Sequence, residues 1–109
     1  MFTIDNETNK MTIVKKDTAS FDVELDNYTL TEGDRVTFTI AKEVEQETPI
    51  RQIVVEEFTD GKATIFISSE KSNIEVGNYI YDIQINTADG RVDTVVGPAK
   101  FTVIGGVTY

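Results

Sequence analysis

Carboxylates are the main groups in this 109-residue sequence that could bind a metal or take part in a reaction, because it has nineteen Asp and Glu residues and neither histidine nor cysteine. Five of them fall in segments expected to be loops, namely Asp26, Glu32, Asp34, Asp60 and Asp89. Calcium takes about six to eight oxygen ligands, and loops that gather at one end of a β-sandwich can supply them. The sequence has no EF-hand-type run, and its Asp-Gly pairs are typical of tight turns. The turn interpretation is favoured, calcium binding is kept as an alternative, and no cofactor is predicted.

The residue content predicts a protein that is not an enzyme. Histidine and cysteine are absent, which removes the commonest general base and the thiol nucleophile. No Gly-x-Ser-x-Gly or glycine-rich phosphate-binding motif occurs. A glycosidase would need a pair of carboxylates, but most acids here fall at outward strand positions, where solvation accounts for them.

A carbohydrate-binding module is the main functional alternative. Such modules stack sugars on exposed aromatic rings, but this chain has no tryptophan, and most of its tyrosines and phenylalanines fall at inward positions. Phe66 and Ile80 are the exceptions, because their neighbours place both on outward faces of strands. They mark a candidate assembly or docking surface, unless the N-terminal arm covers them.

The elements that must position these residues are strands. Apolar residues alternate with polar ones, as in Phe21-Asp22-Val23-Glu24-Leu25, and this period of two is typical of half-buried strands. Turn signals recur between such segments, which predicts an all-β, immunoglobulin-like antiparallel β-sandwich of about seven strands. The expected strands cover residues 11–13, 21–25, 36–40, 52–56, 63–67, 79–85 and 92–103. The predicted core consists of Phe21, Val23, Val36, Phe38, Ile40, Ile65, Tyr79, Ile83, Ile85 and Phe101.

The sequence predicts a single domain at residues 11–104 with a short segment on either side. Residues 1–10 are expected to form an N-terminal arm or an extra strand, and residues 105–109 a linker or tail. Residues 68–73 are polar and predict one helical turn that crosses between sheets, followed by Ile74 in the core. Tyr79 and Tyr81 are both candidates for a tyrosine corner. Gly97-Pro98 predicts a bulge or an edge crossing in the last strand.

The charge balance bears on partners and location. Ten basic residues against nineteen acidic ones give a net charge of −9, which repels phosphate backbones and anionic lipid headgroups. Neither nucleic acid nor a membrane is predicted as a partner. The first residues lack the basic start and apolar run of a signal peptide, which indicates a protein made in a cytoplasm.

Four segments taken together resemble a known family. They are residues 16–21 (KDTASF), residues 30–40 (LTEGDRVTFTI), residues 77–84 (GNYIYDIQ), and an ending with Asp89-Gly90, Thr94, Gly97 and Phe101-Thr102-Val103. In this order they resemble the N-terminal domain of the baseplate upper proteins of phages and prophages of Gram-positive bacteria. The resemblance covers residues 11–109.

The resemblance implies an immunoglobulin-like, non-enzymatic module of a phage tail. Such a module anchors distal tail components to the baseplate core through protein–protein contacts. The implied partners are other tail or baseplate proteins, and members of such families are often trimeric through segments outside this domain. The implied location is the virion, after assembly in the bacterial host cytoplasm.

Overall fold

The computed structural model describes residues 2–25, 28–43 and 48–106 of the chain. These residues contain no helix, so the prediction of an all-β protein is confirmed. Accordingly, the described segments include no helix long and apolar enough to cross a membrane. The strands are β1 (Phe2–Ile4), β2 (Met11–Val14), β3 (Ala19–Val23), β4 (Arg35–Ala41), β5 (Arg51–Val55), β6 (Ala63–Ile67), β7 (Gly77–Asn86) and β8 (Val92–Ile104).

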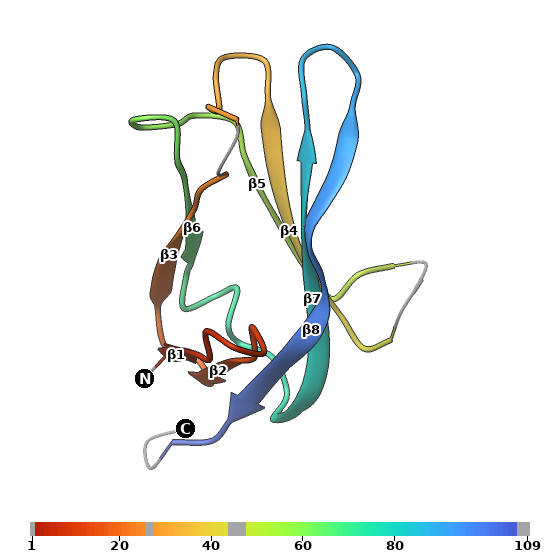
Figure 1. Ribbon diagram of the computed structural model, residues 1–109. Helices are drawn as coiled ribbons and strands as arrows, with labels where there is room; N and C mark the ends of the chain where they lie inside the picture. Colours follow the sequence, from red (N-terminus) through yellow and green to blue (C-terminus); the bar gives the residue numbers. More distant parts are fainter. Residues whose placement is uncertain (1, 26–27, 44–47, 107–109) are drawn as a thin grey trace.

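The strands form two sheets (Figure 1). The larger sheet has the order β1-β2-β8-β7-β4-β5, and the smaller one pairs β3 with β6. The prediction of purely antiparallel sheets is wrong at one place, because β2 pairs with β8 in parallel, with Met11 opposite Phe101. A hairpin would force its two strands to be antiparallel, but β2 is followed by a crossing to the small sheet, so its direction relative to β8 is unconstrained.

Alternation along the strands separates the core from the surface. In β4, Val36, Phe38 and Ile40 are buried, while Thr37 and Thr39 between them face outward. β6 alternates in the same way. All ten predicted core residues pack into one cluster, in which Phe21 alone is half-buried and the others are buried.

Aromatic rings form the centre of this core. The ring of Phe38 lies 5.6 Å from that of Phe21, 5.4 Å from Tyr81 and 6.1 Å from Phe101. Phe21 belongs to the small sheet and the other three to the large one, so these contacts join the two sheets. Phe2 of β1 stacks on Phe21 at 6.0 Å, which ties the N-terminal strand to the same cluster.

The connection from β6 to β7 contains the expected turn. The Ser72 amide donates to the carbonyl oxygen of Ser68 at 3.0 Å, and Ile74 is buried beyond it. The Tyr79 hydroxyl donates to the carbonyl oxygen of Glu75 at 2.6 Å, which is the bond expected of a tyrosine corner. The Tyr81 hydroxyl instead donates to the carbonyl oxygen of Asn9, so it anchors the N-terminal turn.

Two predicted backbone features are also present. Asp60 and Gly61 have φ values of 53° and 76°, and they form a two-residue turn between Thr59 and Lys62. β8 runs through Gly97 and Pro98 as one strand, with register irregularities opposite the segment from Tyr81 to Gln84. The last residues of the expected tail, 107–109, lie outside the described part of the chain.

Candidate functional site

Phe66, the first residue of the predicted assembly surface, lies on the outer face of the small sheet. Its side chain is 56% exposed, whereas Ile65 and Ile67 on either side are fully buried. Its cross-strand partner is Ser20, which is too small to cover the ring. The strand therefore holds an apolar ring in solvent on a well-packed support.

Ile80, the second predicted residue, lies on a different face. It is half-buried on the outer side of β7 in the large sheet, opposite Lys100 of β8. The core separates the two sheets, so Phe66 and Ile80 point away from each other and do not share one surface. The N-terminal strand pairs with β2, which leaves Phe66 exposed.

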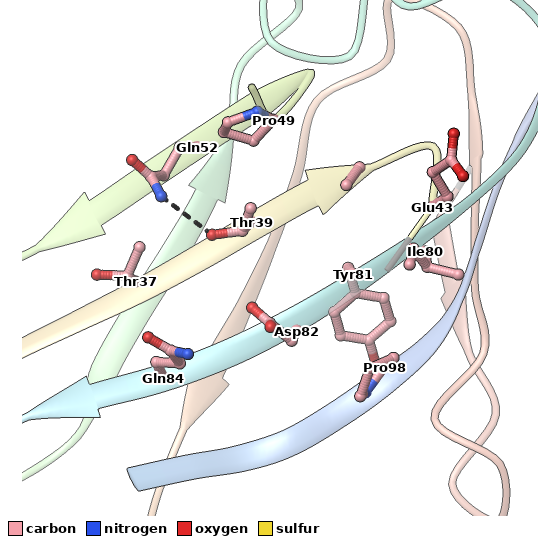
Figure 2. Close-up of a pocket in the computed structure, with 11 residues that line it drawn as sticks. Thr37, Thr39, Glu43, Pro49, Gln52, Ile80, Tyr81, Asp82, Gln84 and Pro98 are labelled. Carbon is pink, nitrogen blue, oxygen red and sulfur yellow. Dashed lines mark hydrogen bonds between the residues drawn. The ribbon is translucent and has the colours of Figure 1, made fainter. Parts of the chain in front are cut away.

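Ile80 borders a pocket of about 310 Å³ on the outer face of the large sheet (Figure 2). Its floor carries the outward side chains of three neighbouring strands, and Glu43 and Pro49 approach from the β4–β5 connection. The floor side chains are those of Thr37 and Thr39 of β4, Gln52 of β5, and Asp82 and Gln84 of β7.

Hydroxyl, amide and carboxylate groups give this pocket its chemistry. The Gln52 side-chain amide donates to the Thr39 hydroxyl at 3.2 Å. Asp82 is half-buried, and this burial raises the pKa of its carboxyl above the ordinary value of 3.8. Threonine and glutamine both donate and accept hydrogen bonds, so the floor can match a ligand that also does both, such as a polyol.

Sequence reasoning did not single out this pocket. The alternation of apolar and polar residues predicts outward positions for Thr37, Asp82 and Gln84, but an outward polar position is ordinarily a solvated one. The signal that could have found them is the order of the strands, since only the adjacency of β4, β5 and β7 brings these side chains together.

Asp34, one of the predicted calcium candidates, has a structural role at one end of the sheets. It is 2% exposed and accepts hydrogen bonds from the Tyr28 hydroxyl at 2.7 Å, the Thr31 amide at 3.0 Å and the Ala88 amide at 3.0 Å. These bonds, the Thr31 amide first, hold the pKa of Asp34 below 3.8 against the opposing effect of burial. Its oxygens therefore join the loop before β4 to the loop after β7.

The other calcium candidates do not converge in the structure. Asp89 accepts hydrogen bonds from the Thr87 hydroxyl and from the Arg91 amide, and these lower the pKa of its carboxyl. Asp60 occupies the tight turn before β6, Glu32 lies exposed beside Gly33, and Asp26 lies outside the described residues. Across residues 2–25, 28–43 and 48–106, no group of three or more acidic side chains is arranged to hold a metal ion.

Comparison with known proteins gives no family assignment. No protein-family model matches the chain. No curated protein sequence matches it either.

Proposed function

We propose that this chain is a non-enzymatic structural module of a phage tail or baseplate that anchors neighbouring tail components through protein–protein contacts. The resemblance noted in the sequence supports this role. Its segments map onto strands of the domain: residues 16–21 enter β3, residues 30–40 include most of β4, residues 77–84 begin β7, and the final segment runs from the turn before β8 into β8. The resemblance therefore involves strands of both sheets.

The finer fold that we propose is an immunoglobulin-like sandwich. Immunoglobulin-like domains group strands C, F and G in one sheet and strands B and E in the other. Here β4, β7 and β8 are adjacent in the large sheet, and β3 pairs with β6 in the small one. The hydrogen bond from Tyr79 to Glu75 at the start of β7 supports the same assignment, because a tyrosine corner occupies that position in strand F.

The exposure of Phe66 is the observation that carries a contact-based role. The Phe66 ring is 56% exposed on a strand that is already paired with β3. A partner that binds this ring therefore does not have to order the strand, which would reduce the affinity. Aromatic side chains are enriched where proteins meet, since they bring a large contact area on few rotatable bonds. Acidic residues nearby, such as Asp22, would give this surface a polar rim.

Immunoelectron microscopy of phage particles tests the proposal directly. An antibody raised against the purified domain is expected to label the tail of particles induced from the source bacterium. Pre-absorption of the antibody with the domain should remove the label. Label on the bacterial wall and none on the virions would contradict the proposal and favour a surface protein.

Self-association is a separate part of the proposal. We place any trimerisation in segments outside this domain, as the resemblance implies. The high negative charge supports this view, because three chains of −9 repel one another when they meet. Light scattering is expected to report a monomer for residues 1–109, and a stable trimer would contradict this placement.

A carbohydrate-binding role is the second candidate, and the polar pocket beside Ile80 is the observation that favours it. Ligand binding to the native state alone raises the melting temperature by mass action. A glycan that binds there should raise the Tm of the parent but not of Gln84→Ala, and Phe66→Ala on the opposite sheet serves as the control. A calcium titration in the same assay tests the metal alternative.

A further inference from the structure

The small sheet has an unpaired edge. Within the described residues β3 pairs only with β6, so the backbone groups along its other side have no neighbouring strand. β8 has a comparable free stretch, because β2 covers only its last four residues, from Phe101 to Ile104.

An apolar groove lies between these two edges. One cavity of about 460 Å³ is lined by Val23 and Leu25 from the β3 side and by Val95 and Val96 from β8. A second cavity of about 380 Å³ shares Leu25 and Val95 and reaches Ile85. Leu25, Val95 and Val96 are only partly buried although they pack against the core. The core is therefore only partly covered between these two edges.

The two edges differ in their readiness to pair with a further strand. Register irregularities interrupt β8 opposite Ile83, and Pro98 removes one backbone donor. Bulges and prolines are features that protect edges against pairing. β3 has a regular five-residue register with β6 from Ala19 to Val23. An incoming strand would therefore hydrogen-bond to β3 and turn its apolar side chains toward β8.

We propose that this groove accepts an extended segment of a partner protein, which adds to the free edge of β3 and completes the core. The occupant needs apolar side chains at alternate positions, because successive residues of a strand point to opposite faces. Asp22 and Glu24 on the β3 side and Asp93 on the β8 side lie at the rim, where Lys62 pairs with Glu24 at 3.5 Å and Arg91 pairs with Asp93 at 3.1 Å. Asp22 has no such cation partner within the described residues, so the rim keeps a small excess of negative charge. The outward residues of the occupant should therefore include lysine or arginine.

The charge of the chain also selects the occupant. A second copy would bring another −9 to this acidic rim, whereas a basic segment would be attracted to it. That the partner is another tail protein rests on the proposed function. The binding of a strand in the groove does not rest on the proposed function. Either the strand binding or the tail role can therefore be wrong without the other.

A tethered strand tests the groove in the intact chain. Phe2 stacks on Phe21, so β1 begins beside β3 and a segment added before it can reach the free edge of β3. The extension would be Thr-Val-Lys-Val-Thr-Val-Lys followed by a Gly/Ser linker of about six residues, since a short linker gives a high effective concentration. The control extension keeps its valines and replaces Thr and Lys by proline, which removes the backbone donors at those positions and disfavours pairing as a strand.

We expect the alternating extension to raise the Tm by about 4–8 °C above that of the proline control. Hydrogen exchange should slow at amides of Ala19–Val23 in the alternating fusion alone. Equal melting of both fusions would overturn the proposal. Slowed exchange at Phe2–Ile4 without a change in β3 would also overturn it, because the strand would then have paired with β1. If the unfused chain is a dimer that the tethered strand dissociates, the occupant is a second copy and the choice of partner is wrong.

Discussion

The Tyr28 hydroxyl lies 2.7 Å from the carboxylate of Asp34 and donates a hydrogen bond to it. Asp34 also accepts hydrogen bonds from two backbone amides in different loops, that of Thr31 close by in sequence and that of Ala88, 54 residues further along the chain than Asp34. One buried carboxylate thus holds together the end of the molecule where the β7–β8 hairpin turns.

Asp34 should make the protein sensitive to acid. Its folded-state pKa lies below 3.8, so its contribution to stability is complete above the unfolded-state value and is lost as the pH falls through the folded-state value. We expect Asp34→Asn to lower the Tm at pH 7, because a neutral amide cannot accept all three bonds. The difference from the parent should shrink as the pH falls from about 5 toward 2, as the carboxylate is protonated. Melting curves across this range provide the measurement, and Asp60→Asn in the exposed turn should follow the parent.

Phe38 and Phe66 form a matched pair of the same residue type. Phe38 is fully buried among three aromatic rings, so Phe38→Ala should reduce the free energy of unfolding by about 3–5 kcal/mol. Phe66 is 56% exposed, and Phe66→Ala should change it by no more than about 0.5 kcal/mol. Urea unfolding of both variants checks the prediction. A similar cost for the two would contradict the assigned faces of β4 and β6.

Tyr79→Phe removes a single hydroxyl from the corner before β7. The lost bond to the carbonyl oxygen of Glu75 should cost about 1 kcal/mol of unfolding free energy. Chemical denaturation measures this change. Because the ring remains buried in place, an unaltered stability would show that water replaces the hydroxyl without penalty, and the corner would then have no stabilising role.

Ser72→Ala tests the contact between the β6–β7 connection and the segment before β3. The Ser72 side chain is fully buried, and its hydroxyl donates to the carbonyl oxygen of Asp17 at 2.6 Å. Leaving that acceptor without the bond should cost about 1–3 kcal/mol. Ser20→Ala at an exposed position of β3 is the control and should be nearly neutral. Thermal unfolding of both variants shows whether a loss of stability comes from the buried hydrogen bond of Ser72 or follows from replacing any serine by alanine.

The sequence alone determined the strands and their inward faces. Alternation of apolar and polar residues has a period that matches only a strand, so Phe38 and Ile83 could be assigned to the core, and Phe66 to the surface, from local pattern. The Asp60-Gly61 turn was equally predictable, since both residues readily take positive φ. These features depend on neighbours in sequence, and the sequence contains that information directly.

Only the tertiary structure decided which strands are neighbours and which contacts distant loops make. The parallel pairing of β2 with β8, the use of Asp34 as a link between loops, and the choice of Tyr79 over Tyr81 all require contacts that local pattern does not specify. The polar pocket and the groove beside β3 also arise from strand order. A residue's local preference fixes the face on which its side chain lies, but the partner across the fold depends on how the whole chain closes around its core.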